Sequence, residues 1–128
     1  MADSKRFEDW FDKANADLTG AGILYEYDGG NDLVAFHCQQ AIEKALKGWL
    51  LRENGELYNS HSLVYLCRQA IRDGAPLQNF LRDCAYVNQF YVETRYPGDT
   101  PLELDADETR ECLEIAQAIL DALMAKEG

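Results

Sequence analysis

The sequence contains few positive charges for its length. Its 128 residues include 12 Lys and Arg against 23 Asp and Glu, and the formal net charge at pH 7 is −11. Clustered Lys and Arg supply much of the affinity of proteins for nucleic-acid phosphates. We therefore do not expect the chain alone to bind a nucleic-acid duplex through a broad basic face, although an acidic body can still carry a local basic pocket.

Residues and motifs that hold metals and cofactors are also scarce. The chain has only two His, so a His-rich metal site is excluded, whereas carboxylate ligands are not. Gly29-Gly30 follows a predicted helix and lacks the Lys-Ser/Thr pair of a phosphate-binding loop, and no nucleophile elbow occurs. We expect no metal and no cofactor, and no catalytic residue is assigned.

The chain has no long apolar run and no pattern of paired cysteines. Its start, Met1-Ala2-Asp3-Ser4, lacks a hydrophobic stretch of secretory length. The cysteines form no Cys-x-x-Cys pair, and each lies among apolar residues in a helical pattern, which predicts buried, reduced thiols at Cys38, Cys67, Cys84 and Cys112. We expect a cytoplasmic protein that does not enter a membrane.

Apolar residues recur with the period of an α-helix along nearly the whole chain. The pattern predicts five helices, at about residues 5–27, 32–54, 60–73, 76–95 and 105–123. Asp105 followed by Glu108 resembles a capping box at the start of the last helix, and Pro76 suits the first turn of the fourth. No segment alternates apolar and polar residues as a half-buried strand would. The sequence therefore predicts one all-α domain over residues 1–128, an antiparallel up-down bundle of about five helices.

One face of the second predicted helix gathers polar residues. At about 100° per residue, a stripe separate from the apolar one is formed by His37, Gln40, Lys44 and Lys47. Two ammonium groups, an amide and an imidazole on one face of an acidic protein could hold phosphate oxygens. The alternative is a solvated face on which Glu43 and Lys47 form an i,i+4 ion pair.

His61 and Arg95 are two further candidates. His61 lies at the start of the third predicted helix, where a neutral imidazole could donate or accept a hydrogen bond in a site, or could act as a capping or packing residue. Arg95 lies one turn after Tyr91, and Pro97 forces the chain out of the helix just beyond it. A guanidinium there could bind a carboxylate or a phosphate, or could cap the last carbonyl groups.

Four segments, in a fixed order, carry a recognisable pattern. They are Trp10-x-x-x-Ala14-x-x-Asp17-Leu18, the run from Phe36 to Lys47, His61-Ser62-Leu63-x-x-Leu66 and Tyr91-x-x-x-Arg95-Tyr96-Pro97. Together they resemble the HEPN domain family (higher eukaryotes and prokaryotes nucleotide-binding domain), over about residues 6–125. The resemblance implies a small antiparallel helical bundle, generally dimeric. Such domains occur alone, fused to other domains, or encoded beside a minimal nucleotidyltransferase in toxin–antitoxin-like pairs.

The family has two branches, and the resemblance favours the one proposed to bind nucleotides. The other branch, of metal-independent endoribonucleases, carries an Arg-x4-6-His signature, but no His follows Arg95 at that spacing. The nucleotide-binding branch carries Gln-x-x-Glu-Lys and Arg-Tyr-Pro, which this chain has at residues 40–44 and 95–97. The resemblance thus implies a nucleotide site that comprises His37, Gln40, Lys44, Lys47, His61, Arg95 and Tyr96.

Each residue of that site has an implied role. Lys44, Lys47 and Arg95 would contact phosphates. Gln40 and His61 would orient ligand or water, and Tyr91 and Tyr96 could stack on a base. We expect Lys44 and Arg95 to lie near one another at the end of a groove. Alternatively, Glu43 ties Lys47 or Arg95 down as a structural ion pair, which would leave no ligand site.

The leading interpretation is a HEPN-type accessory protein that binds a nucleotide, forms a homodimer and works with a nucleotidyltransferase partner, without being an enzyme itself. One alternative is an endoribonuclease toxin whose Arg-x4-6-His site is degenerate. The other is a purely structural bundle that mediates protein interactions.

Overall fold

The computed structural model describes residues 3–95 and 104–125, and for residues 91–95 it describes the backbone alone. Within these ranges the chain forms five α-helices, one 3-10 turn and no strand. They are α1 (Phe7–Glu26), α2 (Asn31–Asn54), α3 (Leu63–Arg72), η1 (Gln78–Phe80), α4 (Leu81–Arg95) and α5 (Ala106–Met124). The predicted all-α bundle of about five helices is confirmed. None of the described helices is long and apolar enough to cross a membrane.

Local hydrogen bonds explain where two of these helices begin or end. The predicted capping box opens α5: Glu108 N donates to Asp105 Oδ1 at 2.7 Å, and Asp105 N donates to Glu108 Oε1 at 3.2 Å. Gly55 ends α2 with a left-handed φ of 76°, and its N–H donates to Leu51 O at 2.9 Å. A residue without Cβ adopts this conformation at little cost.

The third and fourth helices begin later than the sequence suggests. Ser62, not Ser60, caps α3, because its side chain accepts a hydrogen bond from Tyr65 N. Pro76 precedes the helix instead of occupying its first turn. Leu77 N donates to Ala75 O at 2.9 Å there, and this tight turn followed by η1 delays α4 until Leu81. Both differences lie in turns, where short-range contacts override helical periodicity.

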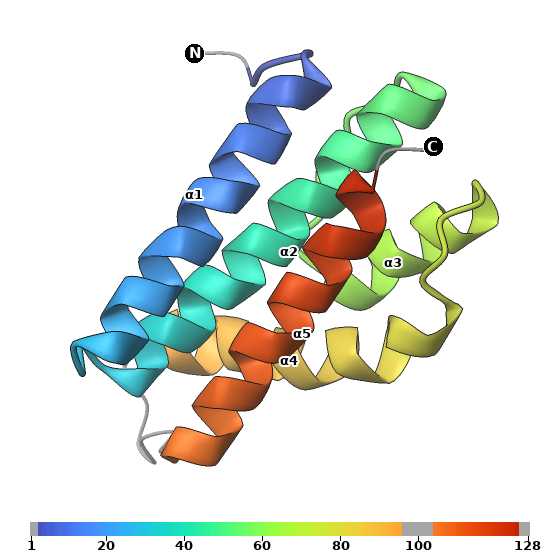
Figure 1. Ribbon diagram of the computed structural model, residues 1–128. Helices are drawn as coiled ribbons and strands as arrows, with labels where there is room; N and C mark the ends of the chain where they lie inside the picture. The colour runs from blue at the N-terminus through green and yellow to red at the C-terminus, as the bar shows by residue number, and fades with distance from the viewer. Residues whose placement is uncertain (1–2, 96–103, 126–128) are drawn as a thin grey trace.

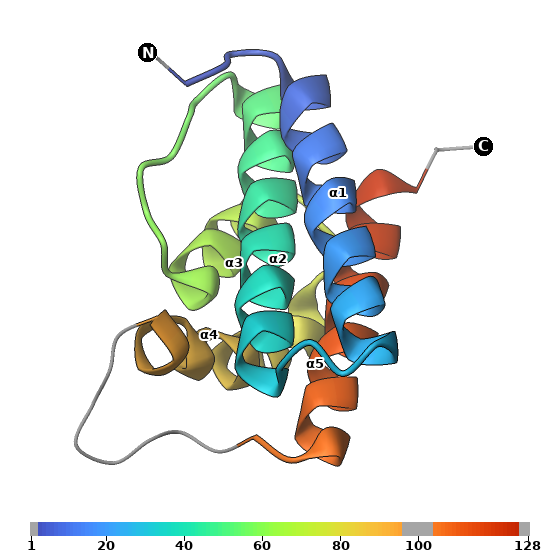
Figure 2. The same ribbon diagram turned by 90° about the vertical axis from the view of Figure 1, so that its left-hand side faces the viewer.

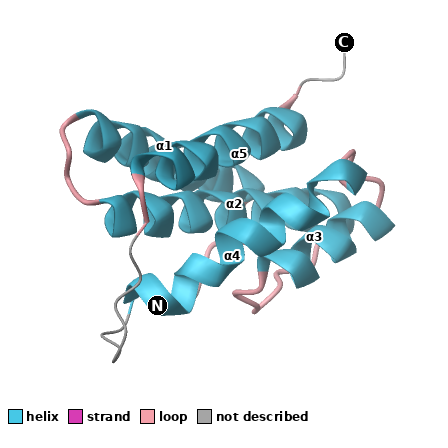
Figure 3. Cartoon of the chain, turned by 90° about the horizontal axis from the view of Figure 1, so that it is seen from below, coloured by secondary structure: helices cyan, strands magenta, loops and turns pink. Residues whose placement is uncertain are grey.

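The central helix of the bundle is α2, which packs against the four other α-helices. In Figure 3, α1 and α5 lie on one side of α2, and α3 and α4 lie on the other. α1 runs antiparallel to α2, and α5 runs in the same direction as α2 (Figure 1). α4 runs across them and is seen nearly end-on in Figure 2. One face of α2 is therefore flanked by α1 on one side and by the segment before α3 and the end of α4 on the other.

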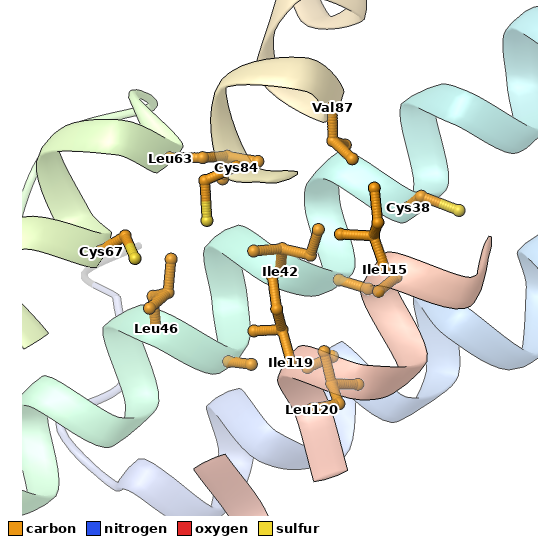
Figure 4. Packing of buried hydrophobic residues seen from close by; sticks show 14 of the residues in the cluster. Cys38, Ile42, Leu46, Leu63, Cys67, Cys84, Val87, Ile115, Ile119 and Leu120 are labelled. Carbon is orange, nitrogen blue, oxygen red and sulfur yellow. The ribbon is translucent and has the colours of Figure 1, made fainter. Parts of the chain in front are cut away.

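The hydrophobic core fills the space between α2 and its neighbours. Figure 4 shows Ile42 and Leu46 of α2 among buried side chains from α3, α4 and α5. The four cysteines are free and buried, as predicted. Burial raises the pKa of the Cys38 thiol, and burial together with nearby carboxylates of α5 raises the pKa of Cys112 to about 12. These two thiols therefore stay protonated at neutral pH.

Candidate functional site

The middle of α2 carries a buried carboxylate, Glu43, that collects polar groups from several directions. Lys47 Nζ donates to Glu43 Oε2 at 3.2 Å, and Gln39 Nε2 donates to Oε1 at 3.2 Å. His61 Nδ1 lies 3.1 Å from Oε1 and 3.3 Å from Oε2. Gln40 Nε2 extends the network by donating to Gln39 Oε1 at 2.7 Å. These five residues are referred to as the Glu43 cluster.

The contact with Glu43 orients the imidazole of His61. A carboxylate only accepts hydrogen bonds, so the proton of a neutral His61 ring belongs on Nδ1. The backbone is held as well, because Gln39 Nε2 donates to His61 O at 3.2 Å. Nearby, Asn88 Oδ1 of α4 accepts a hydrogen bond from Leu63 N at 2.9 Å. The His61 side chain is 60% exposed, so a buried carboxylate aims an imidazole that a ligand can reach.

Lys47, in contrast, is enclosed. Its side chain is only 7% exposed, and its ammonium group lies 5.9 Å from the centre of the Trp10 ring. α1 can approach this closely because Gly48 has no side chain: a Cβ there would lie 2.9 Å from Trp10 Cβ. The Glu43–Lys47 ion pair is therefore part of the interior, in line with the alternative in which Glu43 ties Lys47 down.

A second group, the Asp17 cluster, joins α1 to the neighbouring part of α2. Asp17 Oδ2 accepts a hydrogen bond from Lys44 Nζ at 2.6 Å, and Asp17 Oδ1 lies 3.3 Å from His37 Nδ1. The Asp17 side chain is 16% exposed, whereas those of Lys44 and His37 are 26% and 35% exposed. Lys44 is thus the more accessible of the two lysines, and it already has a carboxylate partner.

The predicted polar stripe is divided between these two clusters. His37 and Lys44 contact Asp17, whereas Gln40 and Lys47 belong to the Glu43 cluster, which His61 joins from the segment before α3. The reason is that the elements on the two flanks of α2 bring their own polar groups to it. The described polar residues of α2 therefore do not form a single row of unpaired donors.

Two predicted site residues cannot be placed in either cluster. The Arg95 side chain lies outside the described part of the structure, although its backbone ends α4, and Tyr96 lies wholly outside it. The expected proximity of the Lys44 and Arg95 side chains stays a prediction.

Helical periodicity missed three residues that shape this site. Asp17 entered only as part of a sequence motif, although it contacts both Lys44 and His37. Gln39 is fully buried, and an amide that interrupts the apolar side of α2 was the available signal. For Asn88, which accepts a hydrogen bond at the start of α3, the sequence offered no signal.

In the described part of the chain, neither a metal site nor the hollow at one end of the bundle competes with these two clusters as the candidate site. Among the described residues, no group of three His, Cys, Asp or Glu side chains is placed to hold a metal ion. A hollow of about 840 Å³ lies where α2, α3 and α5 end, and residues including Trp49, Arg52 and Asp73 line it. Its charged groups are paired with sequence neighbours, Arg52 with Glu53 and Asp73 with Arg72. None of the predicted site residues lines it.

Known proteins share this architecture. TT1696 from Thermus thermophilus is 28% identical in sequence; the match covers 94% of this chain and 97% of that chain, with a TM-score of 0.83. ST0689, an archaeal HEPN homologue, is also 28% identical, and the match covers 94% of this chain and 96% of that chain with a TM-score of 0.74. A comparison with curated proteins found no match.

The fold and the polar groups of α2 define the class of protein: an all-α bundle with paired charges on its central helix. The family model of the HEPN domain matches residues 7–127. The chain belongs to the HEPN domain family, and the resemblance noted in the sequence is confirmed.

Proposed function

We propose that the protein is an accessory HEPN module that does not cleave RNA. It binds a nucleotide weakly on the face of α2 that lies between α1 and the segment before α3. The observation that carries the proposal is the gathering of basic and amide side chains there. His37, Gln40 and Lys44 lie on α2, and Glu43 holds the exposed His61 beside the same helix. Membership of the HEPN family supports the same class of ligand.

Each residue has a distinct role in this proposal. Lys44 contacts a phosphate oxygen, because its ammonium group is the more accessible of the two. Gln40 and His61 orient the ligand through an amide and an imidazole. Lys47 acts indirectly, since it holds Glu43 in the position that orients His61. Arg95 and Tyr96 supply a second cation and a stacking surface, as the family resemblance implies.

The proposal includes partners and a location. Family resemblance supports a homodimer and a nucleotidyltransferase protein as a partner, as in toxin–antitoxin-like pairs. Half-buried aromatic residues on α1, Phe7, Trp10 and Phe11, offer apolar surface that a second copy could cover. A monomer mass measured by light scattering at tens of micromolar protein would refute the proposed dimer. The free, buried cysteines suit the reducing conditions of the cytoplasm.

Two further candidate functions each have one supporting observation. The Glu43–His61 contact favours ribonuclease activity, because a carboxylate that orients an imidazole is a common arrangement for general acid–base catalysis. His61 would then substitute for the His that the Arg-x4-6-His signature lacks. The pairing of both lysines with carboxylates favours a purely structural interaction bundle.

Calorimetric titration with AMP, GMP, ATP and GTP tests the nucleotide proposal. We expect weak binding to the wild type, at least roughly tenfold weaker binding to Lys44→Gln (the worth of about 1.4 kcal/mol), and a modest weakening as salt rises. Lys13→Gln is the matched control, because Lys13 is an exposed lysine of α1 and its loss changes the net charge equally. Equal binding by wild type and Lys44→Gln would remove Lys44 from the site.

Incubation with structured RNA separates the enzyme from the binding module. We expect no cleavage. Cuts that disappear in both His61→Asn and Arg95→Ala would instead establish the ribonuclease function. If neither nucleotide binding nor cleavage occurs, the structural interaction bundle is the remaining function.

A further inference from the structure

Asp17 occupies an unusual position for a residue beside a phosphate site. Its carboxylate accepts a hydrogen bond from Lys44 at 2.6 Å and lies 3.3 Å from the His37 ring. It reaches across from α1, and most of its side chain is buried. The carboxylate therefore sits against the same ammonium group to which the proposed function assigns a ligand phosphate.

The charges around this position are balanced. Lys44 is paired with Asp17, and Lys47 is paired with the buried Glu43. Among the described side chains of the two clusters, two ammonium groups thus face two carboxylates. A phosphate that approaches Lys44 meets a cation whose charge is already largely neutralised, and it also meets the negative charge of Asp17.

The repulsion grows with the charge of the ligand. The interaction of two unit charges falls only as the inverse of their distance, and it is stronger at a protein surface than in bulk water. Each additional phosphate therefore adds repulsion from Asp17. The described clusters offer no further unpaired ammonium group to offset it, and Arg95 is the one other cation that the proposed function assigns to the ligand. The overall charge of −11 acts in the same direction.

We propose that Asp17 is a specificity-determining residue that restricts this site to ligands of low phosphate charge, so that nucleoside monophosphates bind in preference to di- and triphosphates. The inference rests on the proposed function, because it concerns the ligand of the same site. In this inference Asp17 selects ligands by their phosphate charge, and Gln40 and His61 recognise the base and ribose.

A titration series with AMP, ADP and ATP tests this inference on the wild type itself. The buffer contains EDTA and no divalent cation, so that the phosphates keep their full charge. We expect the affinity to fall from AMP to ATP. An affinity that stays level or rises with each phosphate would overturn the inference.

The variant Asp17→Asn should weaken the preference for AMP over ATP. Removing one negative charge next to Lys44 is expected to tighten ATP binding by roughly tenfold and AMP binding by less. Asp12→Asn is the matched control, because Asp12 is an exposed residue of the same helix and its substitution changes the net charge equally. An equal gain in Asp12→Asn would show that only the overall charge matters, and would overturn the role of Asp17.

The double variant Asp17→Asn/Lys44→Gln shows whether Asp17 acts through Lys44. The gain for ATP should be smaller in the Lys44→Gln background, because Asp17 then has no ammonium group to neutralise; an undiminished gain would show that Asp17 does not act on a phosphate held by Lys44 and would overturn the inference. Thermal melts verify that each variant is folded; if Asp17→Asn is not, Asp17→Ser replaces it, and the wild-type series still decides.

The outcomes separate the two proposals. If neither the wild type nor Asp17→Asn binds any of the three nucleotides, both proposals fail. If AMP binds, Lys44→Gln loses it and ATP binds the wild type more tightly than AMP, the proposed function stands and only the restriction by Asp17 fails.

Discussion

Gly48 is the position at which α1 comes closest to α2, and Gly48→Ala tests how tightly the two helices are packed. A Cβ at this position would lie 2.9 Å from Trp10 Cβ, 2.9 Å from Phe11 Cδ1 and 3.0 Å from Phe11 Cε1. The Phe11 ring could turn away, but Trp10 Cβ is bonded to the backbone of α1. The extra methyl group therefore has to push α1 away from α2.

Two opposing effects determine the size of the change. Alanine favours a helix over glycine by up to about 1 kcal/mol, whereas overpacking a buried contact costs about 1–3 kcal/mol. Because the clash involves an atom fixed to the backbone, we expect the cost to exceed the gain. Gly48→Ala should lower the free energy of unfolding by about 1–2 kcal/mol, which lowers Tm by roughly 4–8 °C for a domain of this size.

Gly20→Ala is the matched control. Gly20 lies in the interior of α1, and a Cβ there would have no atom within 4 Å. The same substitution should therefore raise the free energy of unfolding by up to about 1 kcal/mol. Urea unfolding followed by circular dichroism measures both variants. If Gly48→Ala stabilises the protein as much as Gly20→Ala does, the close approach of α1 and α2 is refuted.

Two further predictions concern buried polar groups. Glu43→Gln leaves the enclosed ammonium group of Lys47 without its carboxylate, so we expect the free energy of unfolding in urea to fall by about 3–5 kcal/mol. The double variant Glu43→Gln/Lys47→Met should restore most of this loss. A loss below about 1 kcal/mol would contradict a buried ion pair. The Tyr86 hydroxyl is buried without a hydrogen-bond partner among the described residues, and burial, followed by the nearby Cys112 and carboxylates of α5, raises the pKa of Tyr86 to about 12. Tyr86→Phe should therefore not destabilise the protein at pH 7. Because the folded pKa lies above the unfolded value of about 10, the fold keeps its full stability below pH 10, where the phenol is neutral in both states, and loses stability as the pH rises from 10 to about 12, where the unfolded chain ionises more readily. Between pH 9 and 12 the Tm should fall less steeply with pH for Tyr86→Phe than for the wild type. Identical slopes would show that the pKa of Tyr86 is not raised by folding.

The fold could be predicted because its signals are local. Apolar residues at helical spacing identified the helices, and Asp105 with Glu108 marked the start of α5 to the residue. The start of α4 was predicted less accurately because the turn at residues 75–77 and η1 precede it. The start of α3 was predicted less accurately because either of two residues could cap the helix. Ser60 and Ser62 are both capable caps, and only Ser62 has its side chain placed against the first turn.

The site was less predictable because its contacts are distant in sequence. Spacing within α2 predicted one polar face that carries Lys44 and Lys47, but it could not show which groups of other helices face each lysine. Asp17 precedes Lys44 by 27 residues, and His61 follows Glu43 by 18 residues. The burial of Lys47 depends on a third element, α1, and on the small size of Gly48. No periodic pattern in α2 contains this information.

The contacts between α1 and α2 also determine how strongly the two lysines of α2 can attract a negatively charged ligand. Gly48 lets α1 approach, and α1 then brings Trp10 over Lys47 and Asp17 against Lys44. Both lysines of the face are therefore partly neutralised before any ligand arrives. A nucleotide at the proposed site would therefore gain less from charge attraction than from hydrogen bonds to groups such as Gln40 and His61, which have a defined orientation. In the site that we propose, Asp17 would limit the phosphate charge, whereas recognition of the base and ribose would depend on their pattern of donors and acceptors, because an unmade hydrogen bond at a polar group is costly.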